Sequence, residues 1–316
     1  MTGASGFVGG EIALEFRRAG YQVTALVRSG SDRSHLLGHD ITFVEGSITD
    51  TDAVSRAMAG QDYVCHSAAL VPGSGATDNE YEHVNLYGTR VVCEAAVEAG
   101  ISRLLHVSTA HTFGIYPGLL VDENWTAPTN PRDGYESSKV NSESLVLEFA
   151  SFLLDTVVVN PTVVFGPRSR YGGRLINLFV NGRMPLIPIP DRILSLVYSG
   201  DVARGSRLAL ESGIRGERYI LAGPAVTVRE FIRELADATG RREPRLSLPG
   251  WIVAIGIAAA WGVRPVTRWK PPITVSGVRR GGTIYDGSKV EKELGLRYTP
   301  FDVGISATVA SLQDKL

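Results

Sequence analysis

Three glycines spaced three residues apart open the chain and constrain its fold more than any other feature. The segment Gly3–Gly9 reads GASGFVG and precedes an amphipathic stretch over residues 11–19 and an apolar β-branched run over residues 23–27. In such a turn the first glycine permits a tight bend, the second lets backbone amides approach a pyrophosphate, and the third lets a helix pack closely on a strand. The order loop, helix, strand predicts a dinucleotide-binding loop at a helix N-terminus.

Apolar runs and amphipathic segments alternate as far as about residue 165. We expect strands over residues 23–27, 41–44, 63–69, 103–109 and 156–165, and helices over residues 11–19, 80–99 and 135–152. This alternation is typical of a parallel sheet whose strands are joined by crossover helices. The sequence therefore predicts an α/β fold with a Rossmann-type, doubly wound parallel sheet.

The alternation ends after Gly166-Pro167, where segments rich in proline and glycine begin. We predict a dinucleotide-binding domain over residues 1–166, with residues 195–222 returning to it. Residues 167–194 and 223–316 are expected to form a smaller substrate-binding lobe. Within that lobe the apolar segment Trp251–Trp261 is predicted to be a packed helix, with an apolar substrate wall or a lipid-facing patch as the alternatives.

The loop has almost no chain in front of it, because only Met1 and Thr2 precede Gly3. A glycine loop of this kind follows a buried central strand, so we expect the first strand to be missing from this chain. Its neighbours would then keep unpaired backbone groups beside an open slot. We expect the native product to begin about six to ten residues upstream with an apolar β-branched run.

Composition excludes several classes of protein. The chain has 32 Lys and Arg against 33 Asp and Glu, so it has no electrostatic basis for binding nucleic acid or an anionic membrane. Two cysteines, Cys65 and Cys93, cannot form a disulfide framework and fit a reducing compartment. Without a signal peptide or a transmembrane stretch, we expect a cytoplasmic protein. His35, His39 and Asp40 are predicted to lie in a solvated loop and to bind no metal.

Arg28 closes the second predicted strand, about twenty residues after the glycine loop. An acidic residue at this place would hold the 2′-hydroxyl of NAD, whereas an arginine accommodates the 2′-phosphate of NADP. Arg33 is a second candidate for this phosphate contact. The alternative is that both arginines are simply solvated. We predict NADP as the cofactor, with NAD as the alternative.

Tyr135 and Lys139 are four residues apart on a predicted helix, so their side chains share a face. A nearby ammonium lowers the pKa of a tyrosine toward the working range, which suits an acid/base pair. Tyr285 and Lys289 have the same spacing, but Asp-Gly interrupts that segment and a helix is expected to start after the tyrosine. We therefore interpret this second pair as structural.

Ser108 and Thr109 end a predicted strand, on the edge where open α/β sheets bind ligands. A hydroxyl here can donate to a substrate carbonyl, while an ordinary strand-end turn is the alternative.

These features occur together with further motifs in a fixed order along nearly the whole chain. The motifs are TGASGFVGG at 2–10, HSAA at 66–69, VNLYGT at 84–89, HVSTAHTFG at 106–114, YESSK at 135–139 and NPTVVFGP at 160–167. In this combination the chain resembles the extended short-chain dehydrogenase/reductases, also called the NAD-dependent epimerase/dehydratase family. Its dihydroflavonol reductase and 3β-hydroxysteroid dehydrogenase branches are the most similar.

The resemblance implies a role for each matching residue. Tyr135 would be the acid/base, Lys139 would bind the nicotinamide ribose and tune Tyr135, and Thr109, with Ser108 beside it, would be the catalytic hydroxyl. Asn85 would support cofactor binding, and Ser47 stands where the family commonly has an adenine-contacting aspartate. The implied cofactor site comprises Gly3, Ser5, Gly6, Phe7, Val8, Gly9, Arg28, Ser47, Ile48, Ala68, Ala69, Asn85, Lys139 and Pro161.

The function predicted from these residues is an NADP-dependent oxidoreductase that moves hydride between the nicotinamide and a carbonyl/alcohol pair. A nucleotide-sugar epimerase or dehydratase that retains NAD is the first alternative, and only Arg264, Arg268 and Lys270 cluster as cations for its diphosphate. A non-catalytic NADP-sensing protein is the second alternative. The expected partners are a small-molecule substrate, hydrophobic in character, and a second copy of the chain in a homodimer.

Overall fold

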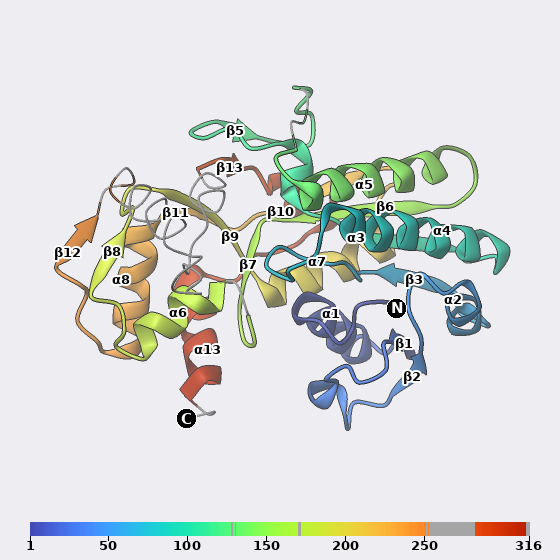
Figure 1. Cartoon of the computed structure of the whole chain (residues 1–316), viewed down its shortest axis with the longest axis horizontal. Helices are drawn as coiled ribbons and strands as arrows, with labels where there is room; N and C mark the ends of the chain where they lie inside the picture. The colour runs from blue at the N-terminus through green and yellow to red at the C-terminus, as the bar shows by residue number, and fades with distance from the viewer. Residues whose placement is uncertain are drawn as a thin grey trace.

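A parallel sheet flanked by helices forms the centre of the computed structural model, which describes residues 1–127, 129, 131–169, 172–248, 250, 252 and 282–313 (Figure 1). One part of the sheet pairs β1 (Val23–Val27) with β2 (Ile41–Glu45). The other part has the order β10-β6-β4-β3. Its strands are β3 (Tyr63–His66), β4 (Arg103–Val107), β6 (Thr156–Pro161) and β10 (Arg218–Leu221), all parallel. The predicted α/β fold with a parallel sheet is confirmed.

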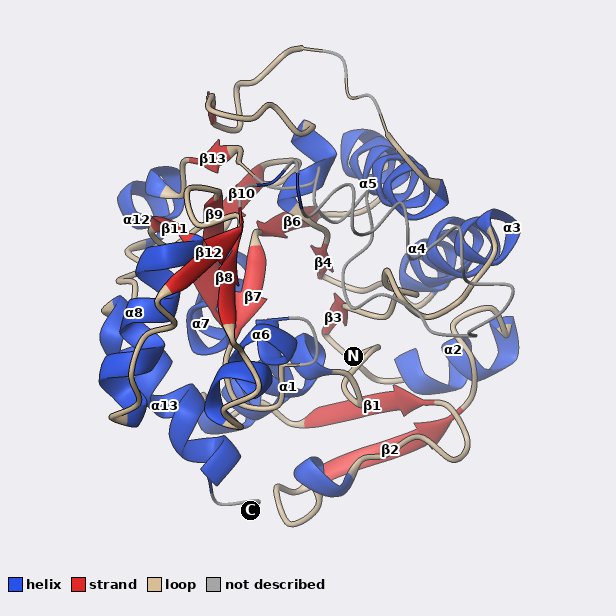
Figure 2. Ribbon diagram, turned by 60° about the vertical axis from the view of Figure 1, so that its left-hand side comes forward, coloured by secondary structure: helices blue, strands red, loops and turns tan. Residues whose placement is uncertain are grey.

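The first two residues of the chain join these two parts. Thr2 forms parallel bridges with Leu26 of β1 and His66 of β3. The amide of Thr2 donates to the carbonyl of Cys65 at 2.9 Å, and the amide of Leu26 donates to the carbonyl of Met1 at 2.9 Å. In Figure 2 the N-terminus accordingly lies between β1 and β3. The expectation of an open slot was wrong at this end of the sheet, because the backbone groups here are paired.

Helices cover both faces of the sheet, so the strand side chains are buried on both sides. On one face α1 (Phe7–Arg18) packs on α7 (Ser199–Ser212), and Leu105 of β4 joins their apolar cluster. On the other face, Leu104 joins the cluster of α2 (Thr51–Met58), α4 (Gly88–Glu98) and α5 (Gly134–Phe152). Neighbouring residues of one strand thus serve opposite faces, as the period of two in a strand requires. Cys65 and Cys93 are free and are buried in these clusters.

The helix predicted over residues 80–99 is a composite. It starts as α3 (Asp78–Tyr81), widens into the π-helical turn η2 (Glu82–Tyr87) and continues as α4. Single π-helical turns inside helices often mark functional sites, and this one contains Asn85.

The strand predicted over residues 156–165 is two strands. β6 ends at Pro161, which has no amide to donate to a sheet ladder. β7 (Val163–Phe165) then leaves the central sheet and pairs with β9 (Ile193–Tyr198) in a second, smaller sheet of order β11-β9-β7. The prediction of one continuous strand was therefore wrong.

The smaller sheet lies beside the central one, on the left of Figure 1. It is completed by β11 (Ala225–Thr227), and nearby β8 (Leu186–Pro188) pairs with β12 (Leu246–Leu248). Three helices surround the apolar cluster here: α6 (Gly172–Val180), α8 (Val228–Thr239) and α13 (Phe301–Gln313). Residues 195–222 were predicted to return to the first domain. Within them, β9 belongs to the smaller sheet, α7 packs on the central sheet, and β10 is a strand of the central sheet.

The remaining elements are short. They are η1 (Ser34–Leu36), η3 (Ala110–Phe113), β5 (Leu120–Val121), β13 (Ile284–Tyr285) and α12 (Ser288–Leu294). Except for Ile252, the apolar segment Trp251–Trp261 lies outside the described residues, as do Arg264, Arg268 and Lys270. No helix in the described ranges is long and apolar enough to cross a membrane.

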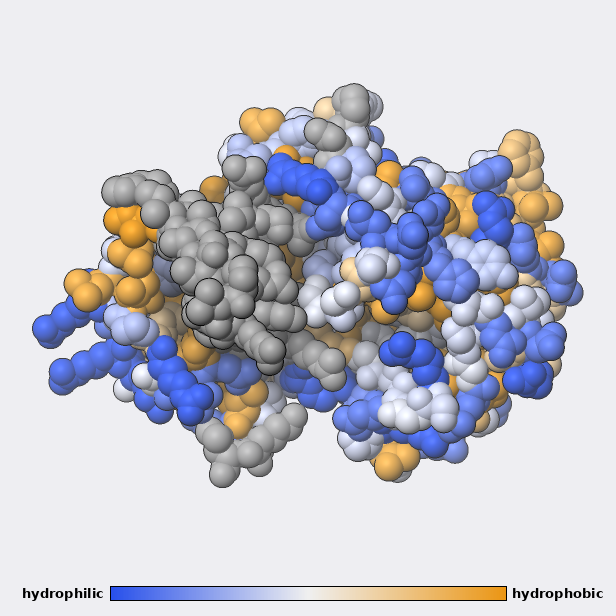
Figure 3. Space-filling view, viewed as in Figure 1, coloured by the Kyte–Doolittle hydropathy of each residue, from blue (hydrophilic) through white to orange (hydrophobic). Residues whose placement is uncertain are grey.

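Apolar side chains gather on the surface at the carboxyl end of α5, at the right of Figure 3. Phe152 is 84% exposed and Leu153 is 64% exposed. These exposed side chains do not test the expected homodimer, which stays a prediction.

Candidate active site

The glycine loop is packed against the chain that follows β3. Gly3 has φ +76°, and a Cβ added to it would lie 2.6 Å from the amide nitrogen of Ala68. A Cβ on Gly9 would lie 2.2 Å from the carbonyl oxygen of Gly3. Gly6 differs, because its φ is −80° and an added Cβ would meet only that oxygen, at 3.2 Å. Folding therefore requires glycine at positions 3 and 9, whereas it leaves the position of Gly6 open toward a ligand.

The N-terminus of α1 has no side-chain cap and no acidic residue in its first turn. Some other helices have a side-chain cap: Asp50 caps α2, Asp133 caps α5 and Thr227 caps α8. The uncapped amides and the helix dipole attract an anion. Together with the glycine turn, this end of α1 fits the pyrophosphate of a dinucleotide.

Arg28 follows β1 directly and is exposed. Its carbonyl accepts from the amide of Ser31 at 3.1 Å, but its guanidinium makes no hydrogen bond or ion pair with the residues that the structure describes. Arg33, the second candidate, lies 3.6 Å from Glu45 and 4.9 Å from the centre of the Phe43 ring. Of the two arginines, Arg28 is the one available to a ligand, because Arg33 is already paired with Glu45.

Ser47 and Ile48 lie in the loop after β2. The hydroxyl of Ser47 contacts that of Thr49 at 2.9 Å and accepts from the Thr49 amide at 3.2 Å. Ile48 is buried, and a Cβ on Gly88 would lie 2.7 Å from its Cδ1. Ile48 thus fixes this loop to α4, while the half-buried Ser47 forms the turn itself.

Asn85 clamps the loop after β3 to the helix of the predicted acid/base. Its buried side chain accepts from the amide of Leu70 at 2.7 Å and donates to the carbonyl of Leu70 at 3.0 Å. It also donates to the hydroxyl of Ser138 on α5 at 2.9 Å. Asn85 therefore fixes the segment that holds Ala68 and Ala69 relative to α5, which is an indirect way of supporting the cofactor site.

Tyr135 and Lys139 lie in the first turns of α5, which Asp133 caps. Tyr135 is half-buried, with its ring edge-on to Tyr81 at 5.9 Å between centroids. Lys139 is buried and donates to the carbonyl oxygen of Val107 at 3.1 Å. Burial lowers the pKa of Lys139 to about 8, while the charge of Glu143 raises it. The ammonium therefore titrates near physiological pH and lies at the carboxyl end of β4.

Ser108 and Thr109 occupy that same strand end. The amide of Ser108 donates to Val159 at 2.8 Å, but its buried hydroxyl has no partner among the described residues. Thr109 is half-buried and caps η3, since its hydroxyl accepts from the amide of His111 at 3.4 Å. A buried hydroxyl without a partner is uncommon in proteins, and at a strand end it suits contact with a ligand.

Tyr285 and Lys289 do not form a second pair of the same kind. Tyr285 is in β13, donates to the carbonyl of Gly114 at 2.6 Å, and has its pKa raised by burial. Lys289 is in α12 and pairs with Glu217 at 2.5 Å. The two residues are therefore in different elements with separate structural partners, in agreement with the structural interpretation.

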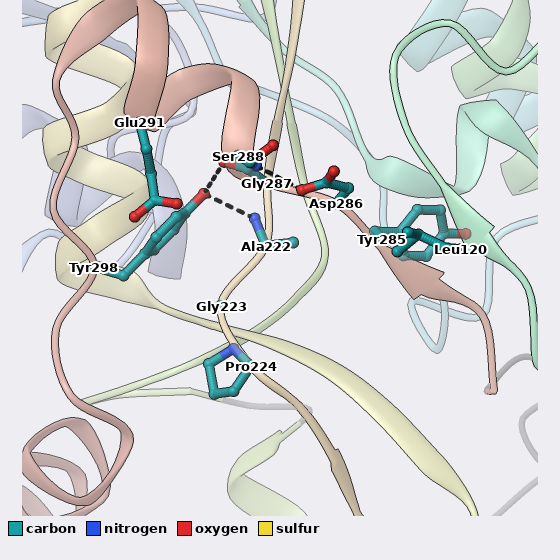
Figure 4. A pocket seen from close by; sticks show the side chains of 10 residues that line it. All are labelled: Leu120, Ala222, Gly223, Pro224, Tyr285, Asp286, Gly287, Ser288, Glu291 and Tyr298. Carbon is teal, nitrogen blue, oxygen red and sulfur yellow. Dashed lines mark hydrogen bonds between the residues drawn. The ribbon is translucent and has the colours of Figure 1, made fainter.

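Tyr285 also lines a cavity of about 400 Å³ beyond the end of β10 (Figure 4). The hydroxyl of Tyr298 points across this cavity, accepting from the amide of Ala222 at 3.2 Å and donating to the carbonyl of Gly287 at 3.3 Å. Neither Tyr135 nor Lys139 lines it.

The two buried histidines of the central sheet differ in their partners. His66 has partners on both ring nitrogens, Thr2 at 2.7 Å and Thr89 at 2.9 Å. Neither ring nitrogen of His106 has a hydrogen-bond partner among the described residues. Burial lowers the pKa of both rings, to about 3 for His66.

The His35 segment forms no metal site. The ring of His35 lies 3.3 Å from the carbonyl oxygen of Ala4 in the glycine loop, and Asp40 pairs with Arg17 at 2.7 Å. In the described ranges no group of three or more His, Cys, Asp or Glu could hold a metal ion.

Sequence reasoning missed three residues at this site. Arg168 has φ +69° and reaches Glu11 of α1 at 3.1 Å, a contact that no motif indicated. Glu143 and Asn160 are buried beside Lys139 and Thr109. The spacing of Glu143, one turn after Lys139 on the same helix, could have indicated it. Pro161, named as a cofactor residue, ends β6 next to Asn160 and is buried.

Comparisons with known proteins fit this geometry. The family model described as "NAD dependent epimerase/dehydratase family" matches residues 1–222. Sterol demethylase protein B of Methylococcus capsulatus is 32% identical, over 100% of this chain and 98% of its own length. A putative dihydroflavonol 4-reductase of Synechocystis is 31% identical, over 94% of this chain and 89% of its own.

Among solved structures, a dTDP-glucose 4,6-dehydratase from Streptomyces venezuelae is similar to this fold. It is a double mutant with NAD and DAU bound. Its TM-score is 0.79 at 25% identity, over 99% of this chain and 96% of that one. Reductases and dehydratases are therefore both among the relatives of this chain.

Proposed function

The chain belongs to the NAD-dependent epimerase/dehydratase family and is an NAD(P)-dependent oxidoreductase, and within this family we propose that it interconverts a carbonyl and an alcohol with Tyr135 as the acid/base. The observation that carries the proposal is the buried ammonium of Lys139, one turn after Tyr135 and at the end of β4. A cation at this place stabilises a phenolate and so eases the release and uptake of the tyrosine proton.

The nicotinamide supplies or accepts the hydride when it is bound. In the direction of reduction, the phenol of Tyr135 gives its proton to the carbonyl oxygen of the substrate. The hydroxyl of Thr109, with that of Ser108 beside it, donates a hydrogen bond to the same oxygen and stabilises its developing charge. Lys139 keeps its proton and holds Tyr135 in the state that exchanges one.

NADP is the proposed cofactor because Arg28 is exposed at the end of β1 and its guanidinium has no partner in the described part of the chain. A guanidinium here pairs with the 2′-phosphate that distinguishes NADP from NAD. Ser47 stands where the family commonly has an aspartate that contacts adenine, so this position carries no negative charge in the chain.

A reductase is favoured over a nucleotide-sugar enzyme by sequence identity, which is 31% or more to two relatives that match nearly the whole chain and 25% to the dehydratase structure. These two relatives are the putative dihydroflavonol 4-reductase and the sterol demethylase protein B. The likeness to the dTDP-glucose 4,6-dehydratase favours the alternative, a dehydratase or epimerase that retains NAD.

A screen for turnover decides between them. Purified protein is supplied with NADPH or NADH and ketones, aldehydes, 3-ketosteroids or nucleotide sugars. We expect oxidation of NADPH with an apolar ketone or ketosteroid and no turnover of nucleotide sugars. Tightly retained NAD with conversion of a nucleotide sugar, and no net oxidation of added cofactor, would contradict the proposal.

A further inference from the structure

Two residues of α5, one turn apart, hold the strand end on either side of Ser108. Lys139 donates to the carbonyl oxygen of Val107 at 3.1 Å. Glu143 accepts from Thr112 and Asn160, and both of these residues also contact the carbonyl oxygen of Thr109. The helix that carries Tyr135 therefore also fixes the backbone of the predicted catalytic hydroxyls.

Glu143 is buried and joins four elements. Its Oε2 accepts from Asn160 of β6 at 2.7 Å and from Thr112 of η3 at 2.9 Å. Its Oε1 accepts from Arg218 of β10 at 3.4 Å, and that guanidinium lies 4.2 Å from the centre of the Phe113 ring. A buried carboxylate with partners on both oxygens orders the groups around it.

The same donors face the backbone of Thr109. Its carbonyl oxygen lies 2.8 Å from the hydroxyl of Thr112 and 3.3 Å from the Nδ2 of Asn160, and it accepts from the amide of Thr112 at 3.1 Å. The amide of Asn160 has two protons and the hydroxyl of Thr112 has one, so these three protons serve both Glu143 and Thr109. Moving the carboxylate would therefore move the carbonyl of Thr109.

Resting on the proposed function, we propose that Glu143 is a positioning residue with two tasks. Through Thr112 and Asn160 it fixes the position of Thr109 relative to Tyr135. Its carboxylate, one helical turn after Lys139, also supplies the negative charge that keeps Lys139 an ammonium.

Among the charged groups near Lys139, Glu143 is the one that favours the protonated form of the lysine. The pKa of Lys139 is lowered to about 8 by burial, and Glu143 is the charge that raises it. His66 of β3 and His106 of β4 face Lys139, but burial lowers the pKa of both, so neither is charged at neutral pH. Arg218 contacts Oε1 of Glu143 at 3.4 Å and offsets part of the negative charge of that carboxylate.

Two substitutions of Glu143 separate the effect of its charge from the effect of its side-chain length. Glu143→Gln removes the charge but keeps an oxygen that can accept from Asn160 and Thr112. We expect it to lower the pKa of Lys139 by about one unit, the low end of the range for an opposite charge a few ångströms away. Glu143→Asp keeps the charge but is one methylene shorter, so it loses those contacts. We expect the pKa of Lys139 to stay near its wild-type value and kcat to fall about tenfold with little change in KM.

Lys139 can be titrated without cofactor or substrate. The chain has five lysines, so NMR of the protein labelled at lysine side chains resolves each ammonium, and Lys139→Met identifies the signal of Lys139. Asp201→Asn is the matched control, since Asp201 is an equally buried carboxylate that accepts from Thr299 on the other face of the sheet. We expect it to leave the titration of Lys139 unchanged.

Thr112→Val is the second variant for the positioning role and remains informative if the Glu143 variants do not fold. It removes the hydroxyl between Glu143 and Thr109, and we expect the same fall in kcat without a change in the titration of Lys139. The inference is overturned if Glu143→Gln leaves that titration as in wild type, or if Thr112→Val keeps wild-type kcat. Absence of turnover by the wild-type protein would instead contradict the proposed function, while the titration still tests the charge of Glu143.

Discussion

Asn85 donates to the hydroxyl of Ser138 at 2.9 Å and so ties the π-helical turn η2 to the helix that carries Tyr135. Ser138 donates in turn to the carbonyl of Tyr135 at 2.8 Å. The same asparagine binds both backbone groups of Leu70, in the loop after β3. One buried side chain thus sets the distance between the glycine-loop side of the site and its acid/base.

Asn85→Ala is expected to lower both stability and turnover. It leaves the amide and the carbonyl of Leu70 without their partner, and an unsatisfied buried group costs about 1–3 kcal/mol. Urea unfolding and steady-state kinetics measure the two effects. Ser138→Ala, which leaves one Asn85 proton without its acceptor but keeps the Leu70 contacts, is the control and should lose less stability than Asn85→Ala. Equal losses in the two variants would show that the Leu70 contacts are unimportant.

Tyr135→Phe is expected to lower kcat by about two orders of magnitude or more, as expected for loss of a general acid. Binding of NADPH, followed by fluorescence, should stay within a few-fold of wild type. Tyr285→Phe is the matched control, because Tyr285 has the same spacing to a lysine but donates to Gly114. A larger loss of kcat in Tyr285→Phe than in Tyr135→Phe would refute the assignment.

Arg28→Asp is expected to reverse the cofactor preference. A carboxylate at the end of β1 repels the 2′-phosphate of NADPH and accepts from the 2′-hydroxyl of NADH. Titration of both cofactors against the two proteins gives the ratio of dissociation constants. Arg33→Ala serves as the control and should leave that ratio unchanged, because Arg33 is paired with Glu45. An unchanged ratio in Arg28→Asp would show that Arg28 does not reach the ribose.

Gly6→Ala and Gly9→Ala are expected to fail in different ways. An added Cβ at Gly9 would lie 2.2 Å from the carbonyl oxygen of Gly3, so this variant should lose stability even without cofactor. At Gly6 the nearest atom would be 3.2 Å away and φ is ordinary, so the fold should survive while cofactor affinity falls. Thermal melting with and without NADPH separates the two. A Gly6→Ala protein with wild-type affinity would contradict the role given to that residue.

Lys139→Met is expected to be inactive but more stable at neutral pH. The pKa of Lys139 in the folded protein is about 8, below the ordinary value of 10.5, so the unfolded chain binds the extra proton between these pH values. The stability of the wild-type protein therefore rises with pH across that window, and protonation opposes folding below it. One pH unit corresponds to about 1.4 kcal/mol, so removing the ammonium should add up to about 3 kcal/mol below pH 8.

The pH dependence is the test of that prediction. The difference in unfolding free energy between Lys139→Met and wild type should be largest below pH 8 and should shrink toward pH 10.5. A difference that stays constant over this range would show that the ammonium is not the cause.

Local patterns were sufficient to predict much of the fold and the composition of the site. The strand over residues 23–27 was predicted with its observed limits, and the helix over residues 135–152 is α5 with one further residue at its start. These elements are specified by apolar periodicity and by neighbouring caps such as Asp133. The same local signals located the glycine turn and the spacing of Tyr135 and Lys139, because each depends only on residues a few positions apart.

Other features depended on contacts between distant segments. Thr2 occupies the position between β1 and β3 because backbone groups of Leu26 and Cys65 are there to pair with it. The strand over residues 156–165 divides because β9, thirty residues later, pairs with β7. Arg33 lies against Glu45 and Phe43, which come ten or more residues later in the chain.

The sequence by itself therefore determined the α/β class, the glycine turn before α1 and the spacing of the proposed Tyr135–Lys139 pair, since periodicity, glycine spacing and helical geometry are local. The tertiary structure alone decided that Tyr285 and Lys289 are held by Gly114 and Glu217, how far the pKa of Lys139 falls, and that Glu143 binds the same donors as the carbonyl oxygen of Thr109. Burial and hydrogen bonding are properties of the assembled interior, where a charge loses its water and takes whatever partners the packing of distant segments provides.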